Sequence, residues 1–191
     1  MNIINPTSTH ERSIHNETEK TFGREQIIRI VIAAIAIALT YVFTAFVNIT
    51  LPIAINGGLI HLGNVPLFLF AILFGKKVGA LAGGIGMGLF DLLSPWAIWA
   101  PFTLVIVGLM GFVVGLISEK KKGFGWSVFA MLMALIIKIV GYYFAEVIIY
   151  GNWVAPFTSI PGNIIQVFVA AVIVMIVIEP LKKAKNSLMP Q

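Results

Sequence analysis

Long apolar runs, separated by short polar segments, fill most of the chain after residue 25. A helix needs roughly 20 apolar residues to cross a bilayer core of about 30 Å, and windows of that kind recur along the sequence. The pattern predicts an all-α integral membrane protein with six transmembrane helices, in a domain covering residues 26–182. The helices are expected at residues 26–47, 63–75, 77–93, 97–118, 125–150 and 159–180.

The composition agrees with a membrane location. Of the 191 residues, 59% are hydrophobic and 11% are charged, and the mean hydropathy is +0.97. These values lie far outside the range of a soluble domain of this size. The segments 1–25 and 183–191 are polar and are predicted to be cytosolic tails. The first tail has no apolar core ahead of a small-residue cleavage site, so no cleavable signal peptide is expected.

Lysine and arginine predict the orientation. Apart from Lys138, every Lys and Arg falls on one side of the six-helix topology, and the loops near residues 48–62, 92–98 and 150–158 contain none. By the positive-inside rule, both termini are expected in the cytoplasm. The formal net charge of +5 is therefore a topology signal, and no nucleic-acid partner is expected.

Lys138 lies about halfway along the fifth predicted helix, where an ionised side chain costs roughly 2.5–3.5 kcal/mol on insertion scales. Steps of four residues place Lys138, Tyr142 and Glu146 on one helical stripe. A direct pair between Lys138 and Glu146 is not expected, because they lie about 12 Å apart along the helix. Structural pairing with neighbouring helices is one interpretation. A wet pocket that opens to the outside is favoured, because ionisable groups inside a membrane usually mark functional sites.

Other polar and aromatic residues gather toward the same outer half. Flat aromatic faces with a few amide and carboxylate groups suit a small, planar, polar heterocycle, although Trp and Tyr also anchor helices at membrane interfaces. The long loop before the second helix, rich in Gly and Pro, is expected to act as a lid. The candidate substrate-binding residues are Asp91, Trp96, Trp99, Lys138, Tyr142, Glu146, Trp153, Asn163, Gln166 and His61.

Motifs of other protein classes are missing from the sequence. It has no GxxxxGK[ST] loop, so this chain is not expected to hydrolyse ATP. It has no cysteine, and His61 has no companion at metal-ligand spacing, so neither a metal nor another cofactor is expected. Ser94, Ser159 and His61 form no catalytic motif, which makes an intramembrane enzyme a weaker alternative. A stand-alone secondary carrier is a further alternative. Such carriers are often built from internal repeats, and the two halves of this sequence show no convincing repeat.

Small residues predict close helix contacts in two places. In the third predicted helix they recur four apart at Gly79 and Gly83, and again at Gly84 and Gly88. In the first helix, Ala34 and Ala38 form a similar stripe. That stripe could contact another helix of the chain or a partner protein.

Several motifs together resemble one family. The segments "LGN" and "FG" around the second helix, "GGIGMGLFDLLS", "WAPFT" and "IPGNIIQ" are similar to the substrate-binding S component of energy-coupling factor (ECF) vitamin transporters. The resemblance covers most of residues 30–182. The most similar branch handles pyridoxine or hydroxymethylpyrimidine-type precursors, with carriers of riboflavin or another B vitamin as the alternative.

The resemblance implies a multi-pass protein of the prokaryotic plasma membrane that captures a vitamin or its precursor from outside. A transmembrane coupling (T) protein and two ATPase subunits would be its partners, and those subunits would use the ATP. Ala34 and Ala38 would match the coupling surface. Asn64 joins the candidate site because relatives tend to carry an acidic residue there. Lys138 stands where relatives usually carry an apolar residue, so the resemblance does not identify the exact substrate.

Overall fold

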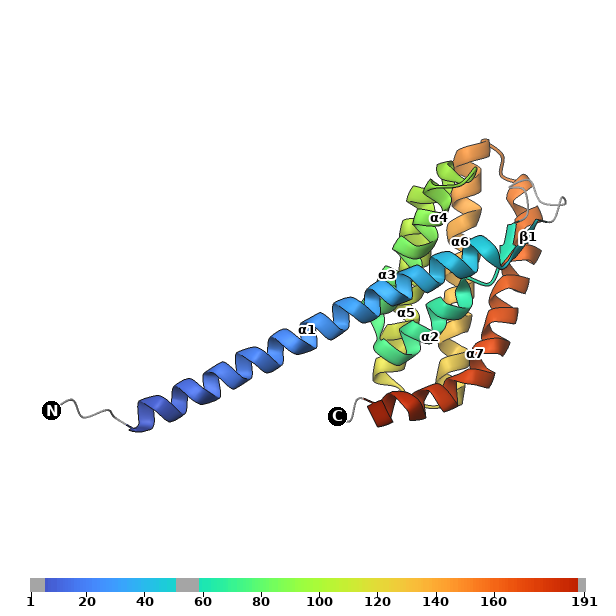
Figure 1. The fold of residues 1–191 in the computed structure, drawn as a ribbon. Helices are drawn as coiled ribbons and strands as arrows, with labels where there is room; N and C mark the ends of the chain where they lie inside the picture. Colours follow the sequence, from blue (N-terminus) through green and yellow to red (C-terminus); the bar gives the residue numbers. More distant parts are fainter. Residues whose placement is uncertain (1–5, 51–58, 189–191) are drawn as a thin grey trace.

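The computed structural model describes residues 6–50 and 59–188, and the side chains of residues 23–49 and 59–187 (Figure 1). The tip of the predicted lid loop, residues 51–58, lies outside these ranges. The elements in chain order are α1 (Pro6–Phe46), β1 (Asn48–Thr50), β2 (Leu59–His61), α2 (Asn64–Phe74), α3 (Lys76–Leu81), the π-helix η1 (Ala82–Met87), α4 (Gly88–Leu92), the 3₁₀ helix η2 (Ala97–Trp99), α5 (Ala100–Lys120), α6 (Phe124–Tyr150), the 3₁₀ helix η3 (Ala155–Ser159) and α7 (Ile160–Leu188).

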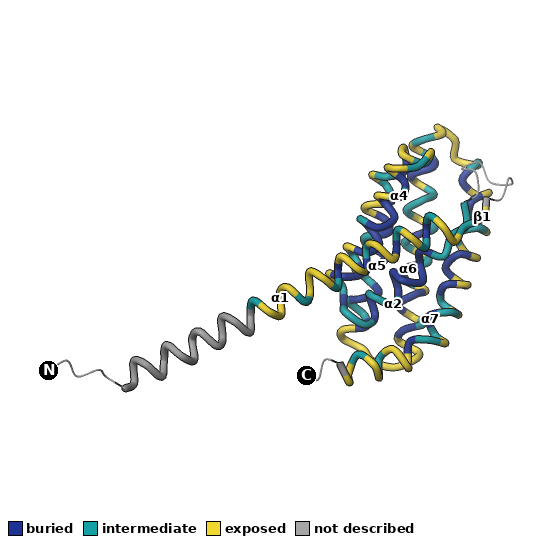
Figure 2. Tube along the Cα trace, viewed as in Figure 1, coloured by how far each residue is buried: buried dark blue, intermediate teal, exposed yellow. Residues whose placement is uncertain are grey.

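The fold is an all-α bundle of membrane helices. Within the described ranges, four helical segments are long and apolar enough to cross a membrane: Gly23–Phe46, Ala97–Lys120, Phe124–Tyr150 and Ala155–Ser187. Between the first and second of them, α2 is a shorter apolar helix, and α3, η1 and α4 follow one another without a break. Figure 2 shows buried residues inside the bundle and many exposed positions around it. Large apolar side chains are exposed on the long helices, for example Ile176 and Phe168, as lipid contact requires.

Close packing between the third helical run and α5 confirms the prediction from small residues. A Cβ atom on Gly79 would lie 2.5 Å from the Gly111 carbonyl oxygen, and one on Gly83 would lie 2.5 Å from that of Val107. Real Cβ atoms do not approach other atoms so closely, so only glycine allows the two backbones to touch. The π-helical turn η1 within this run was not predicted; such turns widen a helix by one residue and often occur at functional sites.

Two helices extend beyond their predicted ends. Helix α1 begins at Pro6 instead of residue 26 and projects from the bundle (Figure 1). Helix α7 continues through Pro180 to Leu188, and its axis changes direction near its C-terminal end, as expected for proline inside a helix. The ammonium of Lys185 donates a 2.6 Å hydrogen bond to the Leu73 carbonyl oxygen and lies 5.3 Å from the Phe74 ring centroid. These contacts hold the last turns of α7 against α2.

A short antiparallel hairpin, which the sequence analysis did not predict, connects α1 to α2. Asn48 pairs with His61 and Thr50 pairs with Leu59. Each strand has three residues, too few to produce an alternating hydrophobic pattern that could be recognised. The hairpin matters for function because it brings the second strand against α7.

Candidate functional site

A small cavity of about 80 Å³ lies where β2 meets α4, η2, α5, α6 and α7. The cavity lies at one end of α5, beside Trp99. The 21 residues of this helix span roughly 30 Å and end at Lys120, at the opposite, lysine-rich end of the bundle. The lining residues are Leu59, His61, Asp91, Trp96, Trp99, Thr103, Lys138, Tyr142, Ser159, Gly162, Asn163 and Gln166.

Most of the candidate residues from the sequence meet at this cavity. They come from five separate elements and the turn before η2, so their meeting is a property of the fold. The predicted residues that line it are His61, Asp91, Trp96, Trp99, Lys138, Tyr142, Asn163 and Gln166. Four further lining residues were not predicted from the sequence: Leu59, Thr103, Ser159 and Gly162. Of these, Thr103 could have been found, because it lies one helical turn after Trp99 in the "WAPFT" motif.

Lys138 and Gln166 form a buried polar link across the cavity. Lys138 is only 2% exposed, and its ammonium donates a 2.9 Å hydrogen bond to Gln166 Oε1. The Gln166 amide nitrogen in turn donates a 2.7 Å hydrogen bond to the carbonyl oxygen of Leu59. Gln166 therefore satisfies the intramembrane lysine and ties α7 to the hairpin at the same time. The hydrogen-bond acceptor of Lys138 is a neutral amide, so this bond does not neutralise an ammonium at that position.

Aromatic rings and hydroxyl groups form another side of the cavity. The Trp99 and Tyr142 ring centroids lie 6.1 Å apart at an interplanar angle of 45°. The Tyr142 hydroxyl is hydrogen-bonded to Thr103 Oγ1 at 2.9 Å, and the Lys138 ammonium lies 5.7 Å from the Tyr142 ring centroid. These contacts lock the Tyr142 ring in place, so a flat ligand would meet a rigid aromatic surface.

His61 presents a neutral imidazole. Its Nδ1 accepts a 3.2 Å hydrogen bond from the Gly63 backbone N–H, which leaves Nε2 to carry the proton. Burial, with the charge of Lys138 as the second cause, lowers the pKa of His61 to about 3. At neutral pH the side chain therefore adds a hydrogen-bond donor to the cavity without adding charge.

Glu146 does not line the cavity, contrary to the prediction. The residue is fully buried, and its Oε2 accepts a 2.9 Å hydrogen bond from Ser159 Oγ. Ser159 itself lines the cavity, so it stands between the carboxylate and the open space. The physical reason is the helix period: eight residues beyond Lys138, the stripe has rotated by about 80°.

Trp153 and Asn64 also lie away from the lining. Trp153 is 62% exposed, and its carbonyl oxygen accepts a 2.7 Å hydrogen bond from the Tyr143 hydroxyl. It lies in the loop after α6, and its exposure agrees with the alternative role of tryptophan at a membrane interface. Asn64 is completely buried at the first turn of α2, and neither of its side-chain polar atoms has a hydrogen-bond partner among the described residues.

Comparison with known proteins identifies the family. The model of the "ECF-type riboflavin transporter, S component" matches residues 24–183. The chain belongs to this family. It is therefore a multi-pass protein of the prokaryotic plasma membrane and a transport component, not an enzyme.

Individual relatives of this S component include one with a named activity. The thiamine precursor transporter HmpT of Lactococcus lactis subsp. cremoris is 30% identical over 162 residues, which cover 85% of this chain and 92% of HmpT. An uncharacterised Pyrococcus woesei protein is 34% identical over 54% of this chain and 69% of its own length. The solved structure of ThiT from Listeria monocytogenes superposes with a TM-score of 0.65 at 21% identity, covering 83% of this chain and 97% of ThiT. The likeness to ThiT supports the fold alone.

The alanines predicted to contact a partner lie on the outer surface of this S component. Ala34 and Ala38 are exposed, whereas Ala33 and Ala36 on the same helix are buried against the bundle. Internal packing therefore does not occupy the stripe of Ala34 and Ala38.

Among the described residues, no group of three or more His, Cys, Asp and Glu side chains could hold a metal ion. The groups that line the cavity can form hydrogen bonds and stack against a ring.

Proposed function

We propose that this S component captures a single-ring vitamin precursor, of the hydroxymethylpyrimidine or pyridoxine type, and delivers it through an ECF importer. The observation that carries the proposal is the small cavity that combines aromatic faces with hydrogen-bonding groups of both kinds. Such a set recognises a flat heterocycle that has both donor and acceptor atoms on its edge.

The size of the cavity supports a small substrate. Its volume of about 80 Å³ is well below the ≈ 300–1,000 Å³ of pockets for drug-sized ligands. Riboflavin has three fused rings and a sugar-alcohol chain, so it would require a much larger opening. The similarity to a thiamine precursor transporter over most of both chains points the same way. Riboflavin remains the second candidate, because the matching family model carries that name.

The lining residues suit such a ligand in complementary ways. The Asp91 carboxylate is an acceptor for an amino or hydroxyl group of the ligand, while Lys138 and His61 are donors for ring nitrogen or oxygen atoms. Trp99 and Tyr142 supply the flat surface against which a ring can stack. Because Lys138 lines the cavity, an ammonium at this position would make a charge-assisted hydrogen bond to a ligand acceptor.

The topology and the partners belong to the same proposal. In the proposed topology, six membrane-spanning segments with both termini in the cytoplasm would put the cavity at the outer side, in accord with the lysine and arginine distribution. A transmembrane coupling protein and two ATPase subunits would supply the energy, since the sequence contains no nucleotide-binding loop. The exposed Ala34 and Ala38 provide a smooth surface on which a helix of the coupling protein could dock.

Equilibrium binding to the purified protein in detergent tests the proposal. Hydroxymethylpyrimidine, pyridoxine, thiamine and riboflavin would be titrated without ATP or sodium, and small molecules that copurify would be identified by mass spectrometry. We expect one of the single-ring compounds to bind most tightly. Tightest binding of riboflavin would establish the alternative, and binding of none of the four by folded protein would contradict the assignment.

A further inference from the structure

A second hollow, here called the basic groove, lies at the lysine-rich end of the bundle, away from the vitamin cavity. It is a groove of about 1160 Å³ between the first part of the α1 span, the junction of α2 and α3, and the ends of α5 and α7. Six cationic side chains line it against two carboxylates, Glu25 and Glu119. The cations are Arg24, Arg29, Lys76, Lys77, Lys122 and Lys185.

The rest of the groove is apolar. The aliphatic and aromatic residues in its lining include Ile28, Ile32, Ile72, Phe74, Val78 and Leu81. Cations alone would suit any soluble anion, whereas an apolar surface continuous with them suits a molecule that has a charged head and a hydrocarbon chain. The groove therefore has the two-part character of a lipid site.

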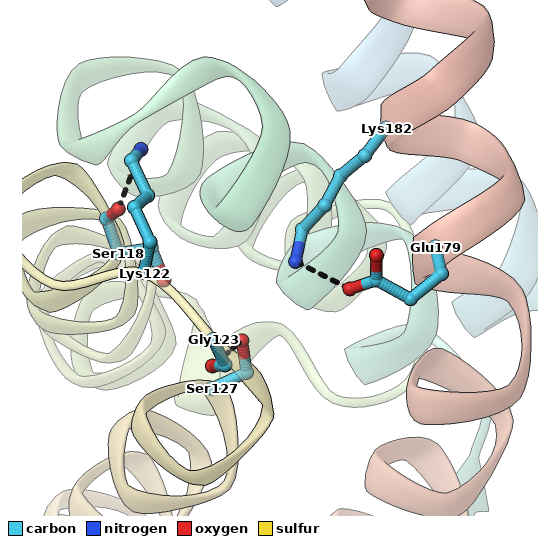
Figure 3. A network of polar contacts seen from close by, with 6 residues as sticks. All are labelled: Ser118, Lys122, Gly123, Ser127, Glu179 and Lys182. Atoms are coloured by element: carbon cyan, nitrogen blue, oxygen red, sulfur yellow. Dashed lines mark hydrogen bonds and ion pairs between the residues drawn. The ribbon is translucent and has the colours of Figure 1, made fainter.

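Some of the cations are already engaged within the protein. Lys76 forms a 3.0 Å ion pair with Glu119, and Lys122 donates a 2.9 Å hydrogen bond to the Ser118 carbonyl oxygen. Figure 3 shows the Lys122 contact together with the Lys182–Glu179 pair, which belongs to the same end of the bundle. Lys182 is not part of the groove lining.

Three groove cations, Arg24, Arg29 and Lys77, have no such partner among the described residues. Arg29 and Lys77 are both exposed, and neither forms an ion pair or a side-chain hydrogen bond with another described residue. They come from different elements, α1 and α3, and face one groove. Both charges line the same groove and are not neutralised by another described residue, so they remain available to an anion there.

We propose that the basic groove binds an anionic phospholipid of the cytoplasmic leaflet. The phosphate would lie between Arg29 and Lys77, and an acyl chain would follow the apolar lining toward Ile72 and Val78. The site is separate from the exposed stripe of Ala34 and Ala38, neither of which lines the groove. Binding there would brace α1 against α2 and α3 at the membrane surface.

Native mass spectrometry of the full-length protein tests the proposal, with dioleoyl phosphatidylglycerol and dioleoyl phosphatidylcholine as the added lipids. The wild-type protein should retain phosphatidylglycerol in preference to phosphatidylcholine. The Arg29→Gln/Lys77→Gln variant should lose that preference, by about fivefold in affinity for each cation removed. Its matched control is Lys120→Gln/Lys183→Gln, which removes two cations outside the groove and should change the affinity by less than about twofold.

A charge-preserving variant keeps the test decisive if the first variant folds poorly. Arg29→Lys/Lys77→Arg should retain the preference for phosphatidylglycerol. Equal retention of both lipids by the wild type, or an equal loss in the groove and control variants, would overturn the proposal. So would displacement of phosphatidylglycerol by the same concentration of inorganic phosphate. If the groove variant lost only its assembly with the coupling protein, the groove would be a protein-docking surface instead.

Discussion

The ammonium of Lys138 and the side-chain oxygen of Gln166 lie 2.9 Å apart, and this bond joins α6 to α7 in the middle of the bundle. Both side chains are almost completely buried, so the hydrogen bond between them satisfies polar groups that have little access to solvent. Because the Gln166 amide also donates a hydrogen bond to the Leu59 carbonyl, a substitution at Gln166 should also weaken the contact between α7 and the hairpin.

The first prediction concerns this pair. Gln166→Leu leaves a buried ammonium without its acceptor and should lower the free energy of unfolding by about 1–3 kcal/mol. Lys138→Met/Gln166→Leu removes both polar partners and should recover much of that loss, although ligand binding should stay weak. Thermal unfolding of the single and double variants in detergent measures the coupling between the two residues. Additive effects would show that the bond does not stabilise the fold.

The second prediction separates the two buried carboxylates. Asp91→Asn removes a negative charge from the cavity lining and should weaken ligand binding at least about tenfold, if the ligand donates a hydrogen bond to it. Glu146→Gln lies behind Ser159 and keeps an oxygen that can accept from its hydroxyl, so affinity should change by less than about threefold. Isothermal titration of both variants makes the comparison. A larger effect at Glu146 would place the ligand deeper than the cavity lined by Asp91.

A third prediction distinguishes the Tyr142 ring from its hydroxyl. Tyr142→Phe keeps the ring and removes the bond to Thr103, which should cost about 0.5–1.5 kcal/mol of stability with little loss of affinity. Tyr142→Ala also removes the stacking surface and should abolish measurable binding. Tyr143→Phe is the matched control, since its hydroxyl bonds to the Trp153 carbonyl outside the cavity. Loss of binding in the control would argue against a ligand at this cavity.

The fourth prediction separates capture from transport. Ala34→Trp and Ala38→Trp place bulky groups on the exposed face of α1, so ligand binding by the isolated protein should survive. ATP-dependent uptake by the reconstituted complex should fail, because small residues are what allow another helix to approach.

Ala36→Trp is the control for this experiment. Ala36 is fully buried, so the larger side chain should destabilise the fold by about 1–3 kcal/mol or more and impair both activities. Unchanged uptake in the Ala34 and Ala38 variants would remove the stripe from the mechanism.

The sequence alone determined the class of the protein and the chemistry of its site. Apolar runs of membrane length predict helices whatever their packing, because the bilayer requires them. An ionisable residue in such a run, here Lys138, requires polar neighbours. The glycine spacing in residues 79–88 predicts a close helix contact, because small residues four apart lie on one face of a helix. The structure shows this contact against α5.

Only the tertiary structure decided which polar groups meet. Helical periodicity places residues on a face of their own helix, but the neighbouring helix and its register depend on packing across the whole bundle. That is why Gln166 as the partner of Lys138, the carbonyl of Leu59 as the partner of Gln166, and the withdrawal of Glu146 behind Ser159 could not be predicted. For the same reason, the sequence could not predict that Ala34 is exposed while Ala33 beside it is buried. An alanine stripe can pack against another helix of the chain or against a partner protein.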